Sequence, residues 1–193
     1  GDVVPNMPAG YILDQTGTFA PSAAAGTNVF LGDDAVSGAL PVGFNFDFYG
    51  NTYTQFYLSS NGFLSFDPAV SQGCCQGGVI PTNDAVNNVI AFDWDDLYPP
   101  GGGSLLYQTT GTAPNRQLVV SIVNMPLFPN STPDVTSQVI LYETSNIIEI
   151  HTTQVTSDGS NQTMGIENAN GTDGLTVPGR NSQSWSATNN AWK

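Results

Sequence analysis

Two neighbouring cysteines, Cys74 and Cys75, have the most distinctive chemistry in this sequence, because they are the only cysteines among its 193 residues. Glycine flanks them at position 73 and again at 77–78. It permits the tight turn that a disulfide between sequence neighbours requires. Such a ring closes no loop of the chain, so the loop-entropy account assigns it little stabilising value. We therefore interpret the pair as a vicinal disulfide with a role in ligand contact, and two free thiols as the alternative.

Side chains suited to ligand recognition lie beside the cysteines and on one other loop. Gln72 and Gln76 flank the pair, and Tyr98 precedes a loop rich in proline and glycine at 99–103. Amides can hydrogen-bond sugar hydroxyls, and aromatic rings pack on apolar faces. We hypothesise that the two loops share one end of the fold and bind a glycan or, as the next choice, a surface or matrix protein. The predicted ligand contacts are Gln72, Cys74, Cys75, Gln76 and Tyr98.

Acidic residues gather in two places that are candidates for a calcium site. Asp93, Asp95 and Asp96 lie at the end of an apolar run, and Asp33 and Asp34 form a second pair. Calcium is bound by six to eight oxygen ligands, among which carboxylates are common. We predict that calcium is bound by the first group, with the second pair as further ligands. A solvated turn is the alternative interpretation.

Catalysis has little support in the sequence. Hydrolysis by paired carboxylates requires two acids roughly 5 to 10 Å apart across a cleft, and only the spacing of Asp93 and Asp95 suggests such a pair. A nucleophilic triad would depend on His151, the only histidine, and on an oriented nucleophile. We predict that the protein is not an enzyme, with a secreted hydrolase as the least favoured alternative, and that His151 is a partly exposed strand residue.

Alternation of apolar and polar residues, the pattern of a half-buried strand, recurs along the chain. It is clearest over 42–48, and Asn61-Gly62 is a strong hairpin signal between strands expected over 53–60 and 63–66. Residues 89–94 are apolar on both faces, which indicates a central strand. Further strands are expected in a meander over 105–109, 117–124, 138–143 and 147–153, then over 163–167 and 174–177 and around Trp185.

These elements predict an all-β fold: a two-layer antiparallel β-sandwich, jelly-roll-like, with about ten strands and little or no helix. A chain of 193 residues fits one domain over 1–193. No signal peptide is visible at Gly1, so we interpret the sequence as a mature protein or an excised module of a larger secreted protein.

The composition excludes several classes of partner. Three basic residues stand against 16 acidic ones, which gives a formal net charge of -13. Such a surface repels nucleic acids and anionic membranes, because binding to phosphates requires clustered lysine and arginine. No apolar run approaches the roughly 18 to 20 residues of a membrane-spanning helix. Charged residues are only 10% of the chain, which is typical of secreted β-proteins that stay soluble through hydroxyl and amide groups.

Several segments form an ordered set over most of the chain: 39–53 (ALPVGFNFDFYGNTY), 57–66 (YLSSNGFLSF), 89–97 (VIAFDWDDL), 139–143, 147–151, 165–168 and 185–192. In this order they resemble the nidogen-like extracellular domain and its relatives in large secreted bacterial surface proteins. The resemblance implies a β-sandwich module of adhesion, matrix or cell-surface proteins with no agreed catalytic residues.

The function predicted from the sequence is therefore that of a non-catalytic extracellular binding or adhesion module, secreted or at the cell surface, which contacts its ligand through the cysteine loop. The alternative is a structural spacer or a self-associating subunit of an extracellular filament or multidomain surface protein. Edge-to-edge pairing of strands would support that second function.

Overall fold

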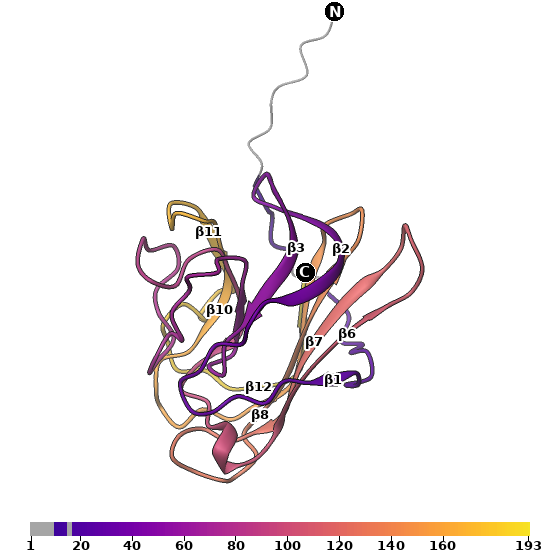
Figure 1. Ribbon diagram of the computed structural model, residues 1–193. Helices are drawn as coiled ribbons and strands as arrows, with labels where there is room; N and C mark the ends of the chain where they lie inside the picture. The colour runs from indigo at the N-terminus through magenta and orange to yellow at the C-terminus, as the bar shows by residue number, and fades with distance from the viewer. Residues whose placement is uncertain (1–9, 15–16) are drawn as a thin grey trace, which may run out of the picture.

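Two antiparallel sheets pack face to face in the computed structural model, which describes residues 10–14 and 17–193 (Figure 1). The all-β sandwich that the sequence predicts is confirmed. The first sheet contains β1 (Thr27–Asn28), β6 (Ser104–Thr110), β7 (Gln117–Met125), β8 (Val135–Tyr142), β9 (Ile148–Val155) and β12 (Ala187–Trp192); the second contains β2 (Leu40–Phe48), β3 (Asn51–Leu58), β4 (Phe63–Ser65), β5 (Val89–Trp94), β10 (Thr163–Glu167) and β11 (Gly174–Thr176).

Consecutive strands are neighbours in most of both sheets. The first sheet has the order β1-β6-β7-β8-β9-β12, and the second has the order β11-β10-β5-β4-β3-β2. The run from β6 to β9 is the meander that the sequence predicts, and this strand order differs from that of a jelly roll. β5 and β10 begin and end at the predicted residues, whereas β1 was not predicted and β12 begins after Trp185.

Helix makes almost no contribution to the described part of the chain. A single 3-10 turn, η1 (Pro99–Gly101), is the only helical segment there. Among the described residues, no helix has the length and apolar character needed to span a membrane.

The main core lies between the sheets and is built from alternate residues of the strands. Along β2, Val42, Phe44, Phe46 and Phe48 are buried, and the residues between them are exposed. Each phenylalanine side chain that is fully buried contributes about 1.5 to 3 kcal/mol. This apolar face therefore holds the second sheet against the first.

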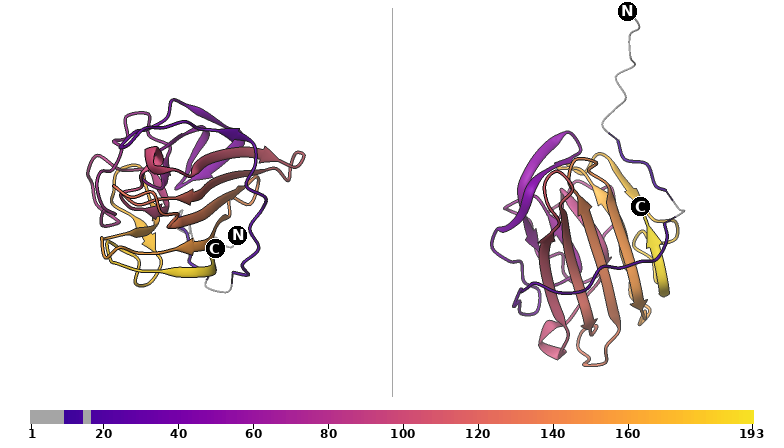
Figure 2. Two further views of the ribbon diagram at one scale, coloured as in Figure 1. Left: turned by 90° about the horizontal axis from the view of Figure 1, so that it is seen from below. Right: turned by 90° about the vertical axis from the view of Figure 1, so that its right-hand side faces the viewer.

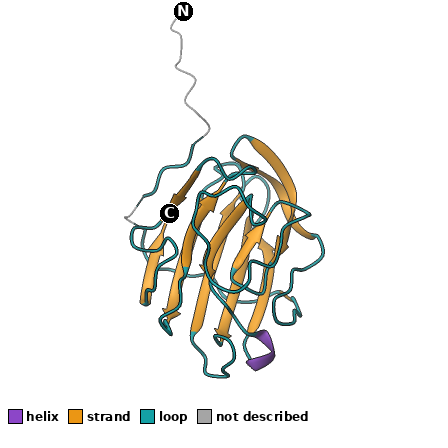
Figure 3. Cartoon of the chain, turned by 90° about the vertical axis from the view of Figure 1, so that its left-hand side faces the viewer, coloured by secondary structure: helices purple, strands orange, loops and turns teal. Residues whose placement is uncertain are grey.

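A second, smaller core lies on the outer face of the second sheet, because the long segment between β4 and β5 folds back over that face. In Figure 3 these loops lie in front of the strands. The cluster explains why β5 is apolar on both faces, as its sequence indicated. Its buried members are Phe63, Val70, Ile80, Val86, Val89, Ala91 and Trp94.

Residues 17–26, which we call the belt, cross the outer face of the first sheet (Figure 2, right). The Gln138 side chain accepts a hydrogen bond from the Ser22 N–H at 2.9 Å and donates to the Ser22 carbonyl at 3.0 Å. His151 Nδ1 accepts a hydrogen bond from the Ala20 N–H at 3.3 Å. The expectation that His151 is partly exposed is wrong: it is 2% exposed, because the belt covers it.

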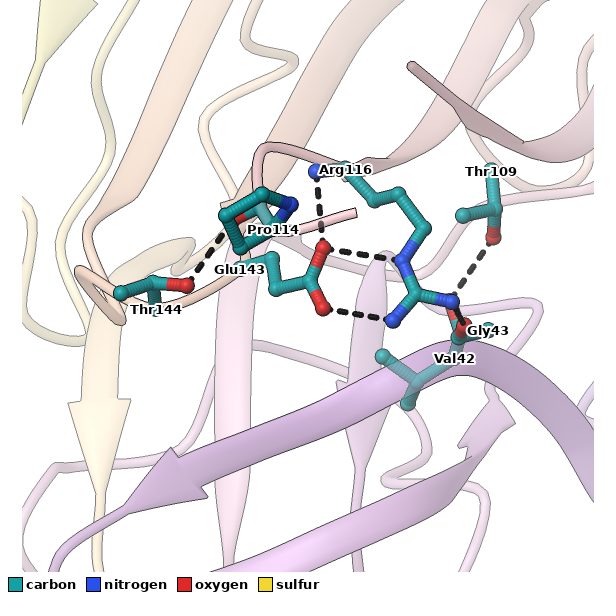
Figure 4. Close-up of polar contacts among 7 residues, drawn as sticks. All are labelled: Val42, Gly43, Thr109, Pro114, Arg116, Glu143 and Thr144. Atoms are coloured by element: carbon teal, nitrogen blue, oxygen red, sulfur yellow. Dashed lines mark hydrogen bonds and ion pairs between the residues drawn. The ribbon is translucent and has the colours of Figure 1, made fainter. Parts of the chain in front are cut away.

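Arg116, which forms an ion pair with Glu143, fixes the edge strand β2 to the first sheet through a hydrogen bond to the Gly43 carbonyl (Figure 4). Arg116 Nε and Nη2 both donate to the Glu143 carboxylate, at 2.8 and 2.5 Å, and Nη1 donates to the Gly43 carbonyl at 2.8 Å. Thr109 donates to the Val42 carbonyl at 2.7 Å. Two backbone carbonyls of β2 thus accept hydrogen bonds from the first sheet at the point where the pairing of β2 with β3 is irregular.

Candidate functional site

Cys74 and Cys75 form the vicinal disulfide that the sequence predicts. Cys74, Cys75 and Gln76 are exposed, whereas Gly73 and Gly77 on either side of them are buried. Residues 74–76 therefore project into solvent from two fixed points, and we call them the disulfide tip.

The base of the disulfide tip is fixed by Trp94, the last residue of β5. The Trp94 indole N–H donates a hydrogen bond to the Gly73 carbonyl at 2.9 Å. Gly73 has a φ of +69°, and a Cβ there would lie 2.6 Å from the Phe63 ring. A Cβ at Gly78 would lie 2.5 Å from the Trp94 ring. Glycine is thus required on both sides of the tip, because the loop contacts buried aromatic rings directly.

Asn61, in the turn between β3 and β4, connects three loops that are far apart in the sequence. Its side chain is fully buried. Nδ2 donates to Asp34 Oδ1 at 2.8 Å and to the Gln72 carbonyl at 3.3 Å, and Oδ1 accepts from the Leu97 N–H at 3.2 Å. The cysteine loop and the loop that leads to Tyr98 therefore meet, in agreement with the hypothesis that they share one end of the fold.

Asp34 also lies against the disulfide. Its Oδ2 is 3.9 Å from Cys75 Sγ. A disulfide sulfur carries no proton to donate, so this approach is a van der Waals contact and not a hydrogen bond. The Asp34 carboxylate therefore places negative charge beside the exposed, apolar disulfide.

Three carboxylates from two loops gather at this position. Asp33, Asp34 and Asp96 each offer an oxygen atom within 4.8 Å of the others. Burial, followed by the charges of Asp34, Asp33 and Asp158, raises the pKa of Asp96 to about 6. Burial and the charge of Asp34 also raise the pKa of Asp33.

The basic side chains of the protein make their contacts away from this carboxylate cluster. Arg116 pairs with Glu143, and Lys193 Nζ lies 3.2 Å from Asp14. The Arg180 guanidinium stacks 4.2 Å from the centre of the Trp185 ring. In the described part of the chain, therefore, no basic side chain forms an ion pair with the carboxylate cluster.

Asp93 and Asp95 join no such cluster among the described residues. Both are fully buried. Asp95 is held by the Ser160 hydroxyl, which lies 2.9 and 3.1 Å from its two oxygens, and burial raises its pKa to about 6. Asp93 has no hydrogen-bond partner for either oxygen, and burial raises its pKa well above the ordinary value. The structure thus brings together only Asp33, Asp34 and Asp96 of the five predicted calcium ligands.

Tyr98 lies beside the cluster in sequence and packs on another aromatic ring. Its ring meets that of Phe128 edge to face, with 5.1 Å between the centres. Phe128 is 44% exposed, and its N–H donates to the Asp96 carbonyl at 2.9 Å. The pair forms a partly exposed apolar surface next to Asp96. In contrast, Trp94 and Trp185 are buried and offer no stacking platform.

Asn61, Ser160 and Phe128 were missed as parts of this region by reasoning from the sequence. Asn61 was assigned only a turn role in the Asn-Gly pair. A turn amide also has donors and an acceptor that can hold neighbouring loops, and that capacity was the available signal. Ser160 and Phe128 lie far along the chain from their partners, and no local pattern marks them.

Searches among curated proteins and among solved structures found no match. The profile of a family described as NIDO related matches residues 10–192, which is nearly the whole chain and includes every loop of the candidate site. This match confirms the nidogen-like resemblance at the level of the family. The chain therefore belongs to the NIDO-related family.

Proposed function

We propose that this protein is a non-catalytic binding or adhesion module of a secreted or cell-surface protein. It contacts a glycan or a surface protein through the disulfide tip, assisted by Gln72 and Tyr98. The observation that carries the proposal is the exposure of residues 74–76 between two buried glycines. A loop held in one conformation before binding loses little entropy on binding, so the tip is suited to contact.

The chemistry of the tip matches a ligand with an apolar face and hydroxyl or amide groups around it. The disulfide offers an apolar surface, and the exposed Gln76 can donate and accept hydrogen bonds. The negative charge of Asp33, Asp34 and Asp96 disfavours anionic ligands at the same place. A neutral glycan meets these conditions better than a sulfated or phosphorylated ligand.

Burial of the candidate acid-base groups argues against a hydrolase. Asp93 and Asp95 are fully buried and His151 is 2% exposed. A general acid or base must lie within hydrogen-bond reach of the substrate. These three side chains do not have that access to a ligand in solvent.

Protected sheet edges argue against self-association by strand pairing. β1 and β11 are short, with two and three residues. Arg116 and Thr109 bind the backbone of β2, and the backbone of Asp14 exchanges hydrogen bonds with Lys193 at the end of β12. Edges of this kind resist pairing with another chain. The spacer or filament subunit is therefore the second choice.

We expect the double substitution Cys74→Ser/Cys75→Ser to abolish ligand binding while the fold is retained, since the disulfide closes no long loop. The measurement is a glycan and peptide array probed with the purified protein and with the variant. Circular dichroism and the thermal midpoint report whether the variant is folded.

Val79→Ser is the matched control, because Val79 is a 55% exposed apolar residue of the same segment outside the tip. It should keep the array signal. A signal that survives the loss of both sulfurs would contradict the role of the tip. No signal with any glycan or peptide would favour the spacer function.

We propose in addition that Asp33, Asp34 and Asp96 hold a calcium ion. Carboxylate oxygens are the ligands that calcium prefers. Burial and then the neighbouring carboxylates raise the pKa of Asp96, and a cation would relieve the repulsion among these carboxylates. Bound calcium would join the loop of Asp33 and Asp34 to the loop that precedes Tyr98.

Calcium is expected to raise the thermal midpoint of the protein relative to chelator. At a concentration 100 times the dissociation constant, binding to the folded state alone adds about 2.7 kcal/mol. Asp34→Asn should abolish this shift, and Asp67→Asn, which changes an acid outside the cluster, should not. An equal shift in both variants, or none in the wild type, would contradict the site. If the protein still binds the array in the presence of chelator, ligand contact by the disulfide tip does not depend on calcium.

A further inference from the structure

A cleft of about 430 Å³ opens between the two sheets, at the side where β9 and β12 face β10 and β11. Its walls are mainly apolar, and several of the residues that line it belong to the main core. Solvent therefore reaches the edge of that core. The residues that form its apolar wall include Ile148, Ile150, Ile166, Leu175, Val177 and Trp192.

Residues 10–14 form a further wall of the cleft and are fixed at two points. The Tyr11 hydroxyl donates to the Asp47 carbonyl at 3.1 Å, at the end of β2. Asp14 and Lys193 exchange backbone hydrogen bonds of 2.6 and 3.2 Å. The cleft is thus bounded by both sheets and by this segment, as ligand sites that exist before binding usually are.

We propose that this cleft binds an uncharged molecule with a long apolar body, such as a fatty alcohol or another neutral lipid. A cavity of about 150 Å³ lined by apolar side chains holds a benzene molecule. By that scale, a cleft of 430 Å³ holds on the order of 15 carbon atoms. Its size and its apolar lining fall within the range of small-molecule sites.

The charges at the mouth of the cleft select a neutral head group. Lys193 and Asp14 are the charged residues of the lining, and they pair with each other at 3.2 Å. The net charge of -13 repels anions from the whole surface. Thr176 is among the residues that line the cleft, and a threonine hydroxyl can donate to or accept from a ligand hydroxyl.

Displacement of the fluorescent probe N-phenyl-1-naphthylamine tests the proposal. The competitors are dodecanol, dodecanoate and dodecyltrimethylammonium, each below its micelle concentration. We expect dodecanol to displace the probe at a concentration at least about tenfold lower than either charged competitor. Absence of probe binding would overturn the site, and equal displacement by dodecanoate would overturn the neutral head group.

Two variants test whether dodecanol binds inside the cleft. Leu175→Trp adds volume inside the cleft from the half-buried edge strand β11 and should weaken dodecanol binding by about tenfold or more. Phe30→Trp adds the same ring at a residue that is 88% exposed and lies outside the cleft, and it should have no effect. Equal affinity in the two variants would contradict the assignment.

A third variant covers the outcome that Leu175→Trp does not fold. Ile147 is 38% exposed at the rim, so Ile147→Glu adds a charge without disturbing the core, and it should also weaken dodecanol binding. Sedimentation tests the rival occupant: a dimer that Ile147→Glu dissociates would show that a second copy fills the cleft. The variant without cysteines should bind dodecanol like the wild type, since this site is separate from the disulfide tip.

Discussion

Gly62→Ala is expected to lower the free energy of unfolding by about 3 kcal/mol or more, from the cost of a positive φ and from overpacking. Gly62 has a φ of +82°, and a Cβ there would lie 1.8 Å from the Asp93 carbonyl oxygen. The Gly62 carbonyl also accepts hydrogen bonds from the N–H groups of Phe92 and Asp93, each at 3.1 Å. Alanine would therefore displace β5, the strand that carries Trp94 and the acidic loop.

Gly38→Ala is the matched control for this experiment. Gly38 has no atom within 4 Å of the position of a Cβ, and its φ lies outside the left-handed region. Its substitution should be neutral or slightly stabilising, because alanine restricts the unfolded chain. The measurement is urea denaturation of both variants. Similar free energies of unfolding would show that the turn can adjust, and would contradict the proposed rigidity of the site.

The protein is expected to be more stable near pH 5 than at pH 7.5. Burial raises the pKa of Glu167 to about 7 and that of Asp95 to about 6. The folded state therefore retains protons that the unfolded chain releases near pH 4, so the free energy of unfolding falls as the pH rises from about 4 to about 7. For Glu167 alone, the loss is on the order of 3 kcal/mol.

Stability should fall again in strong acid, because another carboxyl group behaves in the opposite way. The hydrogen bonds from Arg116 lower the pKa of Glu143 to about 2. Its contribution is present above the unfolded value of about 4.5 and is lost as the pH falls toward 2. The two effects together place the maximum of stability between these ranges.

Glu167→Gln isolates the contribution of one of these buried carboxyl groups. Glu167 is 1% exposed; its Oε2 accepts the Thr82 N–H at 2.6 Å, and its Oε1 has no partner. An amide can keep the first contact without a charge, so the variant should be more stable than the wild type at pH 7.5 and similar at pH 5. Asp173→Asn removes a charge from an exposed site and controls for general repulsion. A variant with the pH dependence of the wild type would contradict the assignment to Glu167.

The sequence was sufficient to predict the strands, because burial between two layers imposes a period of two. The alternation over 42–48 became β2, and the apolar run 89–94 became β5 with both faces covered. The Asn61-Gly62 signal marked the turn between β3 and β4. Each of these predictions depends on residues close together in the chain.

The calcium ligands could not be predicted from their spacing, because β5, the strand that leads to Asp95, is locally irregular. The prediction assumed that Asp93 and Asp95 share one face of a regular strand. In the structure, the Phe92 and Asp93 N–H groups share one acceptor, Gly62, and the pairing of β5 with β10 shifts register. Such a bulge interrupts the alternation of side chains. The cluster at Asp34 and Asp96 depends instead on contacts between distant loops, which spacing cannot reveal.

The pairing of Asp14 with Lys193 has a mechanical consequence. Their backbones exchange two hydrogen bonds, so the two segments lie antiparallel at this point. A tension that pulls residue 14 and residue 193 apart acts on these bonds one after the other, as in opening a zipper, and not on many bonds together. Such a tension would peel the edge of the first sheet at a low force, whereas the disulfide tip, which Trp94 holds on the second sheet, would stay intact.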